Sequence, residues 1–254
     1  MKKIIIVTGA SGGIGREFAL QLDGTQDCDE FWLVARNAER LTALKEKMRT
    51  PARVIAMDLQ ERGSLRDFHY LLEKEKPEIR TLVNGAGYGK FDLFEDISVE
   101  DNLGMIDVNC RALTVMTQIC LPYMRRGANI VNVDSLSAFQ PLPYVNVYAA
   151  TKAYVLRFSR ALNRELKPKG ISVLALCPYW VNTGFFGIAN KHGVIKHFDR
   201  IYEPDWVVRK AIKAMKKRRE VYVPGTLAKT VRALTKVLPH SLVMRVWMKQ
   251  QKLK

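Results

Sequence analysis

Tyr148 and Lys152 stand four residues apart in the segment YAATK, and together they could move a proton. On a helix, residues i and i+4 lie on one face, about 6 Å apart. A phenol has a pKa of about 10, and a nearby ammonium group favours the phenolate. We therefore expect Lys152 to lower the pKa of Tyr148, so that the phenol can exchange a proton with a substrate oxygen.

A second pair with this spacing, Tyr70 and Lys74 in YLLEK, must be distinguished from the first. Ser135 precedes Tyr148 by 13 residues, whereas Met57 holds the equivalent place before Tyr70. The sequence around Tyr70 has the pattern of a charged, amphipathic helix. We interpret Tyr70 and Lys74 as a coincidence on the surface, and Tyr148 and Lys152 as the site.

The segment TGASGGIG, residues 8–15, lies between an apolar strand and a helix, where a glycine-rich turn can bind the phosphates of a dinucleotide. Gly9 permits the tight turn, Gly13 lets the backbone approach a pyrophosphate, and Gly15 lets the helix pack closely on the sheet. The N–H groups that open the helix then point at the phosphates. The candidate cofactor-binding residues of this turn are Gly9, Ser11, Gly13, Ile14 and Gly15.

Short apolar runs alternate with segments of helical spacing along the whole chain. The predicted strands are Ile4–Val7, Phe31–Ala35, Val54–Met57, Thr81–Val83, Ile130–Val133, Val173–Cys177 and Val221–Val223. The predicted helices include Arg16–Leu22, Ala38–Met48, Leu65–Glu75, Met105–Met124 and Val147–Leu166. The inner strands are almost wholly apolar, which is typical of parallel strands covered on both faces. This order predicts an α/β fold with a doubly wound, mostly parallel seven-stranded sheet (a Rossmann fold), in one domain over residues 1–254.

The spacing T-G-x-x-x-G-x-G resembles that of the short-chain dehydrogenase/reductase family, in its short single-domain branch. Further segments resemble the family's motifs in order, over roughly residues 3–185. They are Asp58-Leu59 after the third strand, Asn84-Gly85-Ala86-Gly87 after the fourth (with Val83 in place of the family's first Asn), Asn109 in DVNC, Ser135, and CPYWVNT at 177–183.

This resemblance implies a catalytic tetrad of Asn109, Ser135, Tyr148 and Lys152. Ser135 would hydrogen-bond the substrate oxygen, Lys152 would also hold the nicotinamide ribose, and Asn109 would hold a water that links Lys152 to solvent. The implied cofactor-binding residues beyond the glycine turn are Asp58, Leu59, Asn84, Ala86, Gly87, Tyr148, Lys152, Pro178, Val181 and Thr183. Relatives pair through the helices that hold Asn109 and Tyr148, so the resemblance implies a homodimer or homotetramer.

The residue after the second predicted strand indicates which nicotinamide cofactor is used. An NAD-selective site places an acid there, but this strand ends in Ala35 and is followed by Arg36. A guanidinium at this point can hold a 2′-phosphate, so we predict a preference for NADP(H). The opposing interpretation is that Arg36 is only a solvated loop charge, because Gly12 replaces the basic residue that some NADP-using relatives carry.

The chain departs from the family near the expected substrate pocket. Tyr179 occupies the usual glycine of P-G, and Asp134 stands where relatives often have serine. Residues 184–206 correspond to the variable substrate lid and supply an apolar wall. The candidate substrate-binding residues are Ser135, Tyr148, Tyr179, Phe185 and Phe186, while His192 and His197 are interpreted as lid surface. A hydrophobic, lipid- or steroid-like carbonyl or alcohol is expected.

The net charge of +16 is concentrated at the C-terminus, where residues 207–254 hold 14 Lys and Arg against one acid, Glu220. Residues 226–254 form an extension with apolar residues at helical spacing among the lysines. Such a basic amphipathic segment lies on an anionic membrane surface, or it packs over the substrate mouth or a sister subunit; both alternatives stay open. Nucleic-acid binding is not expected, because the charge lacks interleaved aromatic residues.

The four cysteines are widely spaced, which indicates neither a disulfide framework nor a metal site and favours a reducing cytoplasm. No apolar run has the length needed to span a bilayer, so any membrane contact would be peripheral. Together these features predict an NADP(H)-dependent oxidoreductase that interconverts a ketone or aldehyde and an alcohol by hydride transfer, with Tyr148 as acid and base. The alternative is a non-catalytic NADP-binding regulatory or scaffold protein of the same fold, which retention of the whole tetrad disfavours.

Overall fold

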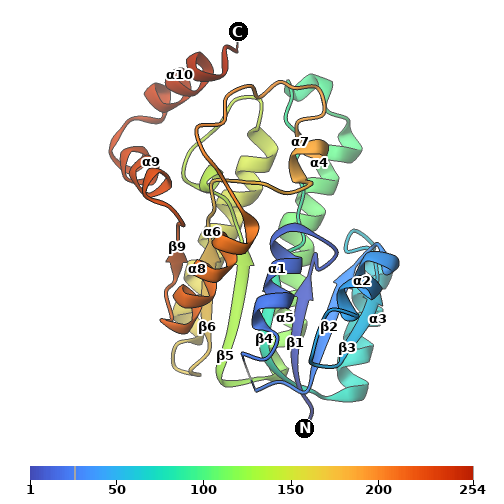
Figure 1. The fold of residues 1–254 in the computed structure, drawn as a ribbon. Coiled ribbons are helices and arrows are strands. Elements are labelled where there is room, and N and C mark those ends of the chain that lie inside the picture. The colour runs from blue at the N-terminus through green and yellow to red at the C-terminus, as the bar shows by residue number, and fades with distance from the viewer. Residues whose placement is uncertain (26, 254) are drawn as a thin grey trace.

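A seven-stranded sheet forms the centre of the computed structural model, which describes residues 1–25 and 27–253 (Figure 1). Every pair of neighbouring strands in it is parallel. The strands in spatial order are β3 (Ala52–Ala56), β2 (Glu30–Ala35), β1 (Lys3–Thr8), β4 (Glu78–Asn84), β5 (Met124–Val133), β6 (Ser172–Leu176) and β9 (Val221–Tyr222). The chain runs outward from β1 to β3 and then returns to β4 on the other side of β1. At such a reversal, the carboxyl ends of the strands border a ligand crevice.

The sequence forms the inner strands because their side chains are buried on both faces. In β1, alternate residues enter different cores: Ile5 and Val7 pack on one side of the sheet, Ile4 and Ile6 on the other. One core lies under α1 (Gly13–Leu22), α2 (Ala38–Lys45) and α8 (Pro204–Lys216), and the other under α3 (Arg62–Glu75), α5 (Leu113–Cys120) and α6 (Asn146–Leu166). The predicted parallel, doubly wound fold with helices on both faces is therefore confirmed.

The helix predicted at Met105–Met124 begins earlier in the structure and is not α-helical throughout. The structure has α4 (Val99–Ile106), a π-helix at Asp107–Ala112, α5, and a 3₁₀ turn at Leu121–Tyr123, after which β5 begins at Met124. Pro122 has no N–H to continue the helical hydrogen bonds, which accounts for the tight turn at the end. A π-helical turn inside an α-helix is frequent at functional sites, and this one contains Asn109.

Other predicted boundaries differ from the structure by a few residues. The helix expected to reach Met48 ends at Lys45, and the strand expected to reach Cys177 ends at Leu176. A small two-stranded parallel sheet of β7 (Trp180–Val181) and β8 (Ile201–Tyr202) was not predicted, because strands of two residues leave no periodic pattern. Between them lies α7 (Phe185–Ala189), so the expected lid 184–206 is partly helical.

The C-terminal extension forms α9 (Thr226–Val237) and α10 (His240–Gln251), which lie at one end of the molecule in Figure 1. The α10 helix is tied to the lid, since the Gln251 side chain accepts from the N–H groups of Lys196 and His197 and donates to the His197 carbonyl. Trp247 Nε1 also donates to the Pro143 carbonyl at 3.0 Å. Over residues 1–25 and 27–253, no helix combines the length and apolar character needed to cross a membrane.

Candidate active site

A cavity of about 690 Å³ opens at the carboxyl ends of the central strands, within the size range of small-molecule and cofactor sites. We call it the crevice. The residues lining it include most of those predicted to bind a cofactor: Gly9, Ser11, Gly13, Ile14, Gly15, Arg36, Asp58, Leu59, Ala86, Gly87, Tyr148, Lys152, Pro178, Val181 and Thr183. The predicted substrate residues Ser135, Tyr179, Phe185 and Phe186 line it too.

The glycine turn forms one wall of the crevice from backbone alone. Gly9 and Gly13 have φ values of 70° and 52°, which favour glycine. A Cβ atom built on Gly15 would lie 2.3 Å from the Gly9 carbonyl oxygen, so any side chain would force the helix away from the turn. Thr8 Oγ1 accepts from the N–H groups of Gly85 and Ala86, which fixes the loop after β4 against the turn. This side-chain-free cradle at the start of α1 fits the pyrophosphate of a dinucleotide.

At the adenosine end of the crevice, the structure brings two guanidinium groups to the end of β2. Arg36 has a side chain that is 70% exposed, with Nη1 3.9 Å from Asp58 Oδ2. Arg40, in the first turn of α2, also lines the crevice, and its backbone N–H is capped by Asn37 Oδ1 at 2.7 Å. Sequence reasoning missed Arg40, because Arg36 lies in the loop before α2 and helical spacing cannot relate the two side chains. The pair suits an anionic group at this end.

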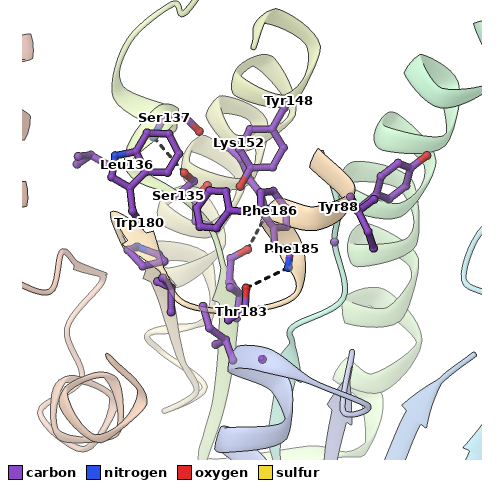
Figure 2. Close-up of a pocket in the computed structure, with 18 of the residues that line it drawn as sticks. Tyr88, Ser135, Leu136, Ser137, Tyr148, Lys152, Trp180, Thr183, Phe185 and Phe186 are labelled. Atoms are coloured by element: carbon purple, nitrogen blue, oxygen red, sulfur yellow. Dashed lines mark hydrogen bonds between the residues drawn. The ribbon is translucent and has the colours of Figure 1, made fainter. Parts of the chain in front are cut away.

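Tyr148, Lys152 and Ser135 meet at one side of the crevice (Figure 2). Tyr148 and Lys152 both belong to α6 and are only 8% and 5% exposed. The Lys152 ammonium donates to the Val133 carbonyl at 2.9 Å and lies 5.6 Å from the centroid of the Tyr148 ring. Ser135 follows β5, and its Oγ accepts from the Ser137 N–H at 3.2 Å. The structure thus brings together three of the four predicted catalytic residues.

The fourth, Asn109, does not line the crevice but lies behind it. Its Oδ1 accepts from the Tyr88 N–H at 3.1 Å, and its Nδ2 donates to the Tyr88 carbonyl at 2.9 Å and to Thr151 Oγ1 at 3.0 Å. The side chain therefore joins the loop after β4 to α6, the helix that carries Tyr148 and Lys152. These contacts use the amide group for positioning, and the expected role of Asn109 in holding a water stays a prediction.

Asn84 is likewise turned away from the crevice. It is 3% exposed, and its Nδ2 donates to Thr117 Oγ1 and Asn132 Oδ1 inside the protein. Its predicted contact with a cofactor is not supported by this position. The side chain links β4 to α5 and β5 instead, because a buried amide must satisfy its hydrogen-bonding groups internally.

Asp134 is a buried carboxyl group at the centre of the site, only 2% exposed. Its Oδ2 accepts from the Cys177 thiol at 3.4 Å, and within the described residues its Oδ1 has no hydrogen-bond partner. Burial raises the pKa of Asp134 to about 7, although the charge of Lys152 opposes this. Burial likewise lowers the pKa of Lys152, while Asp134 raises it. Each group therefore partly compensates the charge of the other.

The expectation that Lys152 makes the Tyr148 phenol acidic is wrong in this structure. Burial raises the pKa of Tyr148 above its ordinary value, an interaction with Ser135 lowers it, and the charge of Asp134 raises it further. Burial is the largest of these effects, because a phenol removed from water loses the solvation that its charged form needs.

The half of the crevice next to Tyr148 is apolar and aromatic. The rings of Phe91 and Phe185 both lie 5.5 Å from the Tyr148 ring, centroid to centroid. Trp180 contacts the rings of Phe186, Phe198 and Trp247 farther out. The C-terminal helices complete this half with Val231, Leu234, Leu238, Val243, Val246 and Trp247. The inward faces of the extension thus pack over the outer end of the crevice, while their outward faces leave membrane contact untested.

Several residues with chemically capable side chains lie outside the crevice. Tyr70 is 60% exposed on α3, as expected for a surface residue. His192 pairs with Asp92, and His197 pairs with Asp199, an acid that does line the crevice. The four cysteines are free thiols. Among the described residues, no group of His, Cys, Asp and Glu side chains could hold a metal ion.

Comparisons with known proteins agree with this geometry. The model of the family described as short chain dehydrogenase matches residues 3–192. An uncharacterized oxidoreductase of Staphylococcus epidermidis is 33% identical over 184 residues, covering 72% of this chain and 79% of that protein. The very-long-chain 3-oxoacyl-CoA reductase of Anas platyrhynchos is 32% identical over 258 residues, covering 97% of this chain and 79% of that protein. The solved structure of a short-chain dehydrogenase from Sphingobium yanoikuyae in complex with NADPH has a TM-score of 0.79 at 27% identity, covering 94% of this chain and 97% of that one.

Proposed function

The chain belongs to the short-chain dehydrogenase/reductase family of oxidoreductases, and from this premise we propose that it reduces a ketone or aldehyde to an alcohol with NADPH, or runs the reverse reaction. The observation that carries the proposal is the meeting of Ser135, Tyr148 and Lys152 beside the glycine-turn crevice. The substrate is an apolar carbonyl or alcohol compound.

In the proposed reaction, the nicotinamide cofactor, when bound, would supply a hydride, an electron pair together with its hydrogen, to the carbonyl carbon. Tyr148 gives its phenolic proton to the carbonyl oxygen, and in reverse it takes the proton of the alcohol. Ser135 donates a hydrogen bond to the same oxygen and so places it near the phenol. Lys152 holds the ribose next to the nicotinamide, and Asn109 keeps α6 in position through Thr151 and Tyr88.

Asp134 favours the direction in which Tyr148 starts out protonated. Taken together, Asp134 and Lys152 are electrically neutral while the phenol keeps its proton. Removing that proton leaves an uncompensated negative charge in a buried site, which is costly. The protonated phenol is the form that donates during reduction, so this electrostatic arrangement favours reduction near neutral pH.

The preference for the phosphorylated cofactor rests on Arg36 and Arg40. Both line the adenosine end of the crevice, and β2 ends in Ala35 instead of an acid that would repel a phosphate. Two planar guanidinium groups suit a 2′-phosphate, which accepts several charge-assisted hydrogen bonds. The NADPH held by the Sphingobium yanoikuyae dehydrogenase supports this choice.

The apolar nature of the substrate rests on the walls of the outer half of the crevice. Phe185, Phe186, Leu238 and Trp247 offer a continuous hydrocarbon surface from Tyr148 toward the C-terminal helices. A long acyl chain or a comparably apolar body would remove this surface from water, contributing about 25 cal/mol per Å² of apolar area buried. The relative from Anas platyrhynchos, a very-long-chain 3-oxoacyl-CoA reductase, supports an acyl substrate.

Pairing of subunits is proposed through α4 and α6. Val99, Leu103 and Ile106 on α4 are 67%, 56% and 45% exposed, and Tyr154 on α6 is 43% exposed. These apolar side chains suit a homodimer or homotetramer. Analytical ultracentrifugation would test this, with Leu103→Glu expected to give monomers and unchanged sedimentation contradicting the proposed interface.

The experiment that tests the function is NADPH consumption over a panel of ketones and aldehydes of increasing chain length. We expect turnover that improves with chain length, because the outer crevice is apolar. The competing proposal is a non-catalytic NADP-binding protein. It predicts tight NADPH binding with no turnover of any member of the panel in either direction.

A further inference from the structure

The outward faces of α9 and α10 expose four large apolar side chains, which we call the apolar rim: Leu234, Val237, Leu242 and Val246. They are 51%, 83%, 43% and 57% exposed. Leu242 and Val246 are separated by one helical turn on α10, and Leu234 and Val237 by three residues on α9, so each pair forms a stripe on its helix. Apolar side chains gathered on one surface mark an interaction site more often than isolated ones do.

The rim is surrounded by positive charge. Lys229 and Lys236 on α9 and Arg245 and Lys249 on α10 are exposed. Residues 226–254 include no Asp or Glu in the sequence. An exposed apolar stripe among uncompensated lysines and arginines is the composition of a segment that lies on an anionic lipid surface, with apolar residues among the acyl chains and basic residues at the headgroups.

The rim is also continuous with the crevice. Leu234 and Val246 belong to both, and behind them Val243 and Trp247 are only 9% and 7% exposed. An apolar path therefore leads from the outer surface of the two helices toward Tyr148. A membrane against the rim would cover the mouth of this path, so that an apolar substrate could enter without crossing water.

We propose that the α9–α10 surface docks on anionic lipid bilayers and that the crevice opens toward the membrane. The entry of substrate rests on the proposed function, but the docking itself does not. A second copy of this chain fits the surface less well, because pairing two such faces would bring like charges together at low separation. In Figure 1, α9 and α10 lie outside the layers of sheet and helices, where a flat surface can approach them.

The test is sedimentation of the full chain with vesicles of phosphatidylcholine alone and of phosphatidylcholine mixed with phosphatidylserine. We expect binding to the mixed vesicles, weakened by added salt, and little binding to the neutral ones. The double variant Val237→Asp/Leu242→Asp should reduce the partition coefficient by about tenfold or more, since both side chains point outward and neither lines the crevice. The control is Tyr70→Asp, which exchanges one exposed apolar side chain for a carboxylate on α3, away from the rim.

A charge variant separates the two contributions to binding. Lys229→Glu/Lys236→Glu should abolish the preference for phosphatidylserine, whereas Lys74→Glu on α3 should leave it intact. Equal binding of the wild type to both kinds of vesicle, or unchanged binding of Val237→Asp/Leu242→Asp, would overturn the proposal. The proposal would also be overturned if the wild type were a dimer and this double variant a monomer. Turnover of a water-soluble ketone reports on the active site separately, so failed docking and failed catalysis remain distinguishable.

Discussion

Replacing Asp134 by Asn should move the pH dependence of both reaction directions to lower pH. The substitution keeps the volume and polarity of the side chain but removes its charge beside Lys152. In the wild type, loss of the Tyr148 proton takes the buried group of Asp134, Lys152 and Tyr148 from neutral to negative. In the variant, the carboxylate charge that raises the pKa of the Tyr148 phenol is gone, so the phenolate forms with one fewer negative charge nearby.

The size of the shift follows from the position of the carboxylate. Asp134 directly precedes Ser135, whose hydroxyl interacts with the phenol, and the whole group is buried. Unit charges on the order of 8 Å apart interact by about 2 kcal/mol at an effective dielectric of about 20, equivalent to about 1.5 pKa units. We therefore expect the apparent pKa of Tyr148, read from the pH profile, to fall by about one unit or more.

The assay is kcat/KM against pH for ketone reduction and for alcohol oxidation. In Asp134→Asn, oxidation should rise at lower pH, because it needs the deprotonated phenol, and reduction should decline at lower pH. Cys177→Ala is the control. It removes the thiol that donates to Asp134 but keeps the Asp134 carboxylate, so the apparent pKa of Tyr148 should not change. An apparent pKa that does not move in Asp134→Asn, with NADPH affinity and circular dichroism unchanged, would refute the electrostatic reasoning.

Three further predictions concern the cofactor, the glycine turn and the outer crevice. Arg36→Ala should weaken NADPH binding by about tenfold or more and leave NADH binding nearly unchanged, and an equal effect on both cofactors in a fluorescence titration would contradict the 2′-phosphate role. Gly15→Ala should lower Tm by about 5 °C or more, because its Cβ would meet the Gly9 carbonyl. Among the described residues, no atom lies within 4 Å of a Cβ built on Gly12, so the control Gly12→Ala should keep the wild-type Tm. An equal Tm for the two variants would argue against the close approach of Gly15 to the Gly9 carbonyl. Trp247→Ala should raise KM for long-chain substrates more than for short ones, whereas Trp206→Ala, on α8 outside the crevice, should raise neither; a uniform loss over all chain lengths would point to a structural defect instead.

The sheet could be predicted from sequence because its inner strands contain continuous buried apolar runs, such as Ile4–Val7 or Phe31–Val34. The glycine turn and the Ser135, Tyr148 and Lys152 set could be predicted because their spacing is local and characteristic. Elements without such a signal were missed. The strands β7 and β8 are two residues long each, and the π-helix around Asn109 breaks a helix whose apolar pattern is uninterrupted.

The electrostatics of the site could not be read from the chain, because they depend on contacts between distant segments. Asp134 and Cys177 are 43 residues apart, and only the fold brings them together beside Lys152. The position of α10 depends on Trp247 reaching Pro143, 104 residues away. Asn84 and Asn109 match family motifs, yet their amide groups are used inside the protein, which only the hydrogen-bond partners reveal.

The central claim is that Tyr148 exchanges a proton with a substrate oxygen inside the crevice, and the rate of NADPH oxidation by Tyr148→Phe tests it most directly. Phenylalanine keeps the ring against Phe91 and Phe185 but has no proton to give. With a ketone that the wild type reduces, we predict that kcat falls by about 10²–10⁴-fold while the Kd for NADPH stays within about twofold. A variant that retains wild-type turnover would contradict the account.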